Sequence, residues 1–152
     1  MTVTIDIAAA AKIIVAALFA GALLAVLLLL VGQVRSFINS RRFDLSSRSS
    51  MKRRWHEIIE LARQPGEVSL KLAVMEADKL LDQALKTLAM PGNTLGERLK
   101  FAAYKYPQLQ RVWFAHRIRN QLAHEASYHL DRPLGIKALK VYRDALRLIG
   151  AV

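Results

Sequence analysis

The N-terminal part of the chain contains a long apolar stretch without a charged side chain. Residues 13–32 read IIVAALFAGALLAVLLLLVG and contain no proline. A helix of about 20 residues is about 30 Å long, which matches the hydrocarbon core of a bilayer, and it satisfies its own backbone polar groups. The pattern therefore predicts one transmembrane helix over residues 13–34, preceded by a short N-terminal segment over residues 1–12.

A cleavable secretory signal is the alternative interpretation of this stretch. Such a signal has a basic n-region, a shorter apolar run and a cleavage site made of small residues. Here Asp6 and Lys12 cancel before the run, and GQVRSFINSRR follows it without an A-x-A pattern. These features favour an uncleaved anchor, with the lipid bilayer as its partner.

The charges on the two sides of the stretch differ strongly. Residues 35–54 carry seven basic side chains against Asp44, whereas Asp6 and Lys12 cancel on the other side. The positive-inside rule places the basic side in the cytoplasm, so we expect a single-pass protein of the cell membrane with its N-terminus outside. The same arginines can also contact nucleic acid, and the charge pattern leaves both roles open.

Beyond residue 50, apolar residues recur at helical spacing, and no long stretch alternates apolar and polar residues. Proline and glycine occur between the periodic segments. The spacing predicts helices over about residues 50–63, 67–90, 94–106 and 107–126, and a last helix that begins after Asp131. Short connections make neighbouring helices antiparallel. We therefore expect an all-α fold in which residues 35–50 form a basic tether and residues 51–152 form an antiparallel bundle of four to five helices.

The helix expected over residues 67–90 has the clearest amphipathic pattern in the chain. Its apolar positions follow the i, i+3, i+4, i+7 spacing: Leu70, Ala73, Val74, Ala77, Leu80, Leu81, Ala84, Leu85 and Leu88. Acidic residues of this helix are Glu76, Asp78 and Asp82. We expect them on the solvated face, or in ion pairs with Lys79 and Lys86.

Composition excludes several kinds of site. The chain has no cysteine, so neither a disulfide nor a thiolate site can form. His116 and His124 would lie about 12 Å apart on one helix, and no acidic cluster completes a zinc shell. We therefore predict no metal and no cofactor. The formal charge of +11 is compatible with a polyanionic ligand without requiring one.

The helix expected over residues 107–126 has two unlike faces. Projected at about 100° per residue, its large apolar residues gather on the side that should face the core. The opposite side carries His116, Asn120 and His124, with Trp113 and Arg117 in the same sector and Arg119 at its flank. A tryptophan outside a core is typical of an interface anchor. We therefore expect Trp113, His116 and Arg117 to be interface or supplementary site residues.

One segment of this helix, RNQLAH at residues 119–124, carries a more specific pattern. Arg119 is followed directly by Asn120 and, after four intervening residues, by His124. This pattern resembles the signature of HEPN domains, which are compact helical bundles. The resemblance covers about residues 55–150, because it excludes the apolar stretch.

The resemblance implies a metal-independent endoribonuclease that acts as a homodimer, in which the motifs of two protomers meet in one cleft. His124 would act as general acid or base on the RNA 2′-OH, because imidazole titrates near neutral pH. Arg119 would hold the scissile phosphate, and Asn120 would orient these groups. The partners would then be RNA and a second copy of the chain.

Many HEPN-like domains keep the fold without the activity, which gives the alternative: a membrane-anchored dimeric scaffold that binds protein through the polar face. A nucleotidyltransferase-type antitoxin is a common partner of HEPN proteins, and here it would be a separate chain. The two functions differ in one feature. Exposed motif residues that converge across a dimer favour the enzyme, whereas burial of Arg119 or His124 against its own bundle favours the interaction module.

Overall fold

The computed structural model describes residues 18–30, 44–125 and 127–152, in a chain that divides into two units, residues 1–39 and 40–152. The second unit contains, in order, α2 (Leu45–Arg63), α3 (Glu67–Thr87), α4 (Leu95–Lys105), the 3₁₀ helix η1 (Pro107–Arg111), α5 (Val112–His124) and α6 (Arg132–Leu148). The described residues contain no strand, so the expected all-helical fold is confirmed for them.

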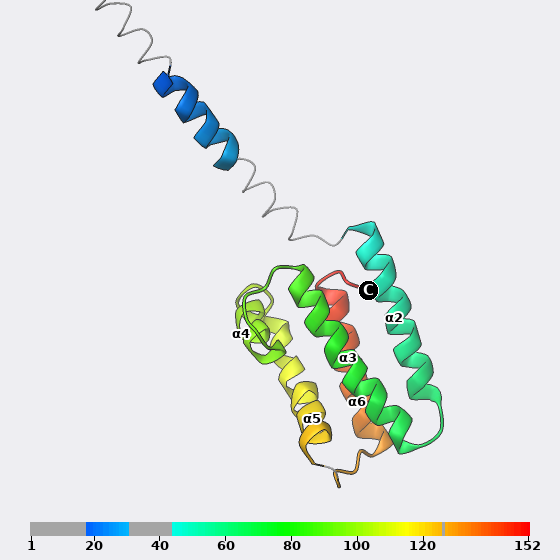
Figure 1. The fold of residues 1–152 in the computed structure, drawn as a ribbon. Coiled ribbons are helices and arrows are strands. Elements are labelled where there is room, and N and C mark those ends of the chain that lie inside the picture. The colour runs from blue at the N-terminus through cyan, green and yellow to red at the C-terminus, as the bar shows by residue number, and fades with distance from the viewer. Residues whose placement is uncertain (1–17, 31–43, 126) are drawn as a thin grey trace, which may run out of the picture. The chain divides into compact units, whose positions relative to one another are not determined.

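The expected transmembrane helix over residues 13–34 is wrong. In the described ranges of the chain, no helix combines the length and the apolar character needed to cross a membrane. Within this stretch the described residues, 18–30, are helical (Figure 1). Residues 13–17 and 31–34 lie outside the described residues. The single-pass topology and the cell-membrane location were inferred from that helix, so both of these predictions are wrong as well.

Helix α2 begins at Leu45, within the segment expected to be a tether over residues 35–50. Asp44 caps it, because its carboxylate accepts hydrogen bonds from the backbone N–H of Ser47 at 2.6 Å and from the Ser46 hydroxyl at 3.0 Å. Both bonds lower the pKa of Asp44, and the bond from the Ser47 backbone has the larger effect. The rest of the expected tether, residues 35–43, and the N-terminal segment of residues 1–12 lie outside the described residues.

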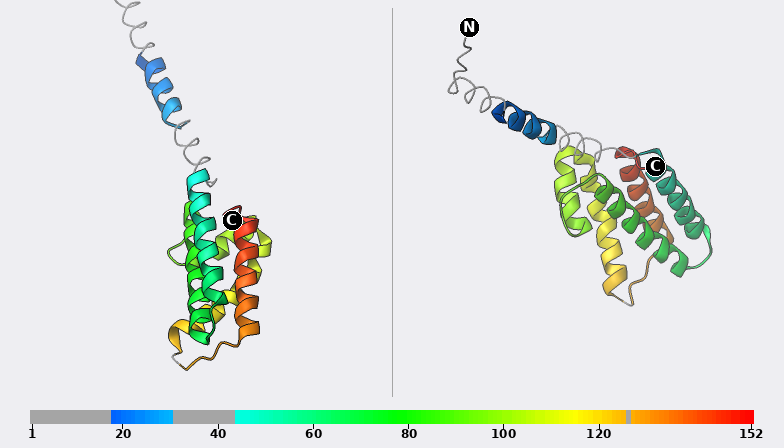
Figure 2. Two further views of the ribbon diagram at one scale, coloured as in Figure 1. Left: turned by 90° about the vertical axis from the view of Figure 1, so that its right-hand side faces the viewer. Right: turned by 45° about the horizontal axis from the view of Figure 1, so that its top comes forward.

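Helix α3 is the central element of the bundle. It contacts α2, α4, α5 and α6, and in Figure 1 it lies in front of α6, with α2 on one side and α5 on the other; Figure 2 shows the same helices from two further directions. Helices α3 and α6 run in one direction, and α2 and α5 run in the opposite direction, as expected for neighbours joined by short connections (Figure 1). The largest fully buried side chains come mostly from α3 and α6: Leu70, Val74, Leu80, Leu81, Leu85, Leu99, Leu109, Val112, Tyr142 and Leu146.

Helices α3 and α6 pack tightly against each other at Gly135. A Cβ atom built on Gly135 would lie 2.6 Å from Cδ2 and 2.7 Å from Cγ of Leu70. Leu70 is itself buried, so its side chain has little room to move away. Glycine at this position therefore sets how closely the two helices pack.

We predict that Gly135→Ala lowers the free energy of unfolding of the full chain by about 1–3 kcal/mol, because the added methyl overpacks the core. Urea unfolding followed by circular dichroism measures this loss. Leu70→Ala removes the obstructing side chain and serves as the background for the control. If Gly135→Ala costs as much in that background as in the native chain, the Leu70 contact is not the cause.

Glu67 fastens the segment before α6 to the first turn of α3. Its Oε1 accepts a hydrogen bond from the backbone N–H of Leu130 at 2.7 Å, and Lys71 Nζ lies 2.8 Å from the same oxygen. His129 Nδ1 lies 3.3 Å from Oε2. These contacts lower the pKa of Glu67 from 4.5 to about 2. The hydrogen bond from Lys71 has the largest effect, followed by those from Leu130 and His129.

This shift predicts a pH dependence of stability. A carboxyl whose folded pKa is depressed stabilises the fold above its unfolded pKa and loses that contribution as the pH falls through the folded value. Stability should therefore decline between pH 4.5 and pH 2 through Glu67, and Glu67→Gln should flatten that part of the profile. Urea midpoints across this range measure the effect. Glu60→Gln, on an exposed pair within α2, is the matched control, and an equal flattening there would contradict the assignment.

Candidate functional site

A buried carboxylate joins three helices of the bundle. Asp78 of α3 is only 3% exposed. Its Oδ1 accepts a hydrogen bond from the Tyr142 hydroxyl of α6 at 2.8 Å and lies 2.7 Å from Nδ1 of His116 on α5. Its Oδ2 lies 3.2 Å from Nε of Arg119, also on α5. We call Asp78, His116, Arg119 and Tyr142 the Asp78 cluster.

The expectation that Asp78 lies on the solvated face of its helix is wrong, because α5 and α6 cover it. The spacing contained the signal, since Asp78 follows Val74 by four residues and precedes Leu81 by three, and both are core residues. The neighbouring expectations hold. Glu76 pairs with Lys79 at 2.7 Å, and Asp82 pairs with Lys86 at 2.8 Å.

The Asp78 cluster offsets the cost of removing a charge from water. A buried carboxylate needs an opposite charge and hydrogen-bond donors. Arg119 supplies the charge, because its Nε lies 3.2 Å from Oδ2 of Asp78. This buried Nε forms an ion pair with the carboxylate but no well-aligned hydrogen bond. Tyr142 supplies a neutral donor. The pKa of Tyr142 is raised, mainly by burial and to a smaller extent by the charge of Asp78. Its hydroxyl therefore stays protonated and keeps donating.

The structure separates the residues of the HEPN-like motif. The Arg119 side chain is 28% exposed and turns inward to Asp78, while its Nη1 donates to Oδ1 of Asn120 at 3.1 Å. Asn120 is half-buried, and His124 is exposed at the end of α5. Five residues on a helix differ by about 140° in direction. Within one protomer, Arg119 and His124 therefore point to different sides of α5.

The expected polar face of α5 is also divided. His116 was expected to be on the surface, but its side chain is 12% exposed and contacts Asp78. Trp113 is half-buried and packs edge-on against the His116 ring, with the centroids 5.9 Å apart. Gly96 of α4 lies against both rings, since a Cβ there would be 3.4 Å from Trp113 and 3.8 Å from His116 Nε2. Arg117 remains exposed.

A shallow hollow adjoins Trp113 between α4 and the η1–α5 segment. It has a volume of about 480 Å³ and is lined by Lys100, Ala103, Tyr104, Gln110 and Trp113. Tyr104 is 89% exposed, and Phe101 of the same helix is exposed as well. We call the surface formed by the hollow, Phe101, Arg117 and His124 the α4–α5 face. The helical pattern of the sequence indicated only the α5 residues of this face.

The chemistry available to these groups is binding, charge compensation and proton transfer by histidine. Among the residues that the structure describes, no group of three or more His, Cys, Asp or Glu side chains could hold a metal ion. Comparisons with protein-family models, with curated proteins and with solved structures gave no significant match.

We predict that Tyr142→Phe lowers the free energy of unfolding by about 1–3 kcal/mol, because Asp78 then loses a buried hydrogen-bond donor. Tyr104→Phe removes a hydroxyl that is exposed to solvent, and it should change stability by no more than about 0.5 kcal/mol. Urea unfolding of the full chain compares the two variants. Equal effects would mean that the Tyr142 hydroxyl contributes nothing through Asp78.

Proposed function

We propose that the bundle of α2 to α6 is a protein-interaction module that pairs with a second copy of itself through the α4–α5 face. The observation that carries this proposal is the engagement of Arg119 and His116 by Asp78 of the same protomer. Arg119, which an RNA-cleaving cleft would use for the phosphate, and His116, expected as a supplementary site residue, are thereby committed to the fold.

The charge of Arg119 supports this choice over catalysis. Stabilising a scissile phosphate requires a guanidinium whose charge and donors are available to the substrate. Here Asp78 offsets the charge, Nε is buried, and Nη1 donates to Asn120. A phosphate would have to compete with a buried carboxylate for the same cation.

The α4–α5 face has the composition of a self-complementary contact. Aromatic residues dominate binding energy at protein interfaces. Here Tyr104 and Trp113 line one hollow, and Phe101 is exposed on the same helix as Tyr104. The same face carries Lys100 and Arg117, which can lie over the aromatic rings of a second copy as cation–π pairs. A two-fold axis would place each such pair twice.

A metal-independent endoribonuclease is the second candidate, supported by the HEPN-like motif and by the exposure of His124. Arg117 precedes His124 by seven residues, so both point to nearly the same side of α5. In a two-fold dimer through this face, two exposed histidines and two exposed arginines would come near each other. Such a site would use Arg117, rather than Arg119, as its phosphate-binding cation.

We predict that Trp113→Ala weakens self-association of the full chain by at least about tenfold, because it removes the central aromatic anchor. Trp55→Ala is the matched control, since Trp55 lies on α2, outside this face. Sedimentation velocity over a concentration series measures both variants. A native chain that stays monomeric throughout, or an equal loss in both variants, would contradict the self-association.

We predict that the purified full chain does not cleave mixed RNA and that His124→Ala behaves as the native chain does. The assay is run with and without a chelator. Chelator-resistant cleavage that His124→Ala reduces by about 10²–10⁴ would establish the ribonuclease instead. DNA of the same sequence serves as the negative control, because it lacks the 2′-OH.

A further inference from the structure

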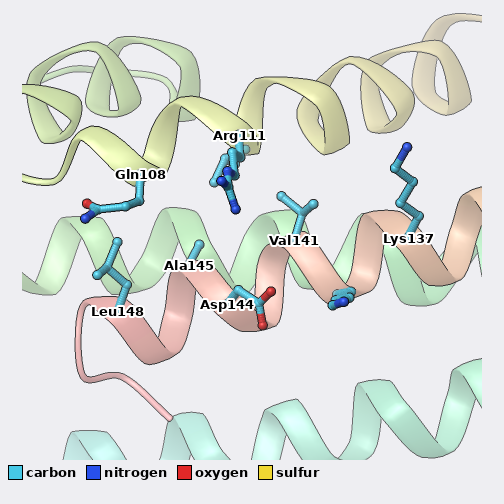
Figure 3. Close-up of a pocket in the computed structure, with 9 residues that line it drawn as sticks. Gln108, Arg111, Lys137, Val141, Asp144, Ala145 and Leu148 are labelled. Carbon is cyan, nitrogen blue, oxygen red and sulfur yellow. The ribbon is translucent and has the colours of Figure 1, made fainter.

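A second surface feature lies on the other side of α5. A groove of about 460 Å³ runs between α6 and the η1–α5 segment. In Figure 3, Gln108 and Arg111 extend from the η1–α5 segment toward α6, while Leu148 and Lys137 lie near opposite ends of the α6 side. This groove shares no residue with the Asp78 cluster or with the α4–α5 face.

The floor of the groove is apolar and follows α6. Val141, Ala145 and Leu148 recur at i, i+4 and i+7, so they form one straight stripe along the helix. Val112 of α5 completes the floor. Leu148 is exposed although it is a large apolar residue. A ligand that places apolar groups along this stripe would remove it from water.

The rim of the groove is basic. Arg111, Lys137 and Lys140 line it, and all three are exposed. Lys137 is held over the Phe114 ring, with Nζ 4.9 Å from the ring centroid. Among the described residues that line the groove, Asp144 is the one carboxylate, and it pairs with Arg143 at 3.3 Å. The rim therefore attracts negative charge over an apolar floor.

We infer that this groove is the docking site of an acidic amphipathic helix from a partner protein. Such a helix would lay apolar residues spaced i, i+3/i+4 and i+7 on Val141, Ala145 and Leu148. Carboxylates flanking that apolar stripe would meet Arg111, Lys137 and Lys140. The stripe from Lys137 to Leu148 is about 17 Å long at 1.5 Å per residue, so about three to four turns of a partner helix would cover it.

Charge and shape together favour this occupant over two others. A second copy that paired through the same groove would place its own basic rim against this one, and the like charges would oppose pairing there. RNA would satisfy the rim, but its phosphates would leave the apolar floor without a partner. The inference does not rest on the proposed self-association, which uses the opposite side of α5.

The test measures binding of a fluorescein-labelled synthetic helix to the purified full chain by fluorescence anisotropy. The probe has about 15 residues, with leucine and alanine on one face and glutamate on the others. A peptide of the same composition in scrambled order has no apolar face. We expect the ordered probe to bind, with an affinity that falls as salt increases, and the scrambled probe to bind at least about tenfold more weakly.

Charge reversal locates the site. The double variant Lys137→Glu/Lys140→Glu should weaken binding by at least about tenfold, because like charges then face the probe. Leu148→Gln should weaken it by about threefold or more without altering the charge. Arg53→Glu, an exposed cation on α2, is the control and should change the affinity by less than about twofold.

Four results would overturn the inference. They are no binding of the ordered probe, equal binding of both probes, equal losses in the groove and control variants, or tighter binding of single-stranded RNA that Lys137→Glu/Lys140→Glu abolishes. Circular dichroism of each variant confirms that its helices are retained. None of these results depends on whether Trp113→Ala alters self-association, so a failure here is distinguishable from a failure of the interaction-module proposal.

Discussion

The arrangement of this bundle depends on one buried carboxylate. Asp78 lies on the central helix α3, where burial would strongly disfavour its charge without partners. Those partners come from α5, through His116 and Arg119, and from α6, through Tyr142. Apolar packing alone tolerates small rotations of a helix, whereas a charge pair fixes which side of α5 faces α3. The orientation of α5 therefore follows from Asp78.

Once α5 is oriented in this way, its remaining sides acquire separate roles. One side meets α4 and carries Trp113 and Arg117 at the aromatic α4–α5 face. The side toward α6 carries Val112 and, with η1 before it, forms the basic groove with an apolar floor. The structure thus leaves two surfaces of different chemistry available for binding, while Arg119 is used within the fold.

Much of the helical pattern could be predicted because it depends on local signals. Periodic apolar residues and the Pro–Gly breaks located α3, α4 and α6 within a few residues. Residues 107–111 were expected to be α-helical and instead form η1. The signal behind that expectation, a proline at the first helical position, is compatible with either helix type. The start of α2 was missed because a serine- and arginine-rich segment resembles a tether, although Asp44 caps it. The apolar stretch shows the limit of composition, since no helix in the described part of the chain is long and apolar enough to cross a membrane. The burial of Asp78 and its contacts with His116 and Arg119 were not foreseen, because a helical projection cannot show which helices cover each flank. The HEPN resemblance remains a prediction.

A double-mutant cycle between Asp78→Asn and Arg119→Gln tests the central claim most directly. Asp78→Asn keeps the shape of its side chain, Arg119→Gln shortens its side chain, and each removes one charge of the pair. Urea unfolding of the native chain, the two single variants and the double variant gives the coupling energy. A contact made within the folded protomer predicts a coupling of about 1–3 kcal/mol, with the double variant less unstable than the sum of the singles. Additivity within about 0.3–0.5 kcal/mol would show that Arg119 is not held by Asp78, and the commitment of this arginine to the fold would be contradicted.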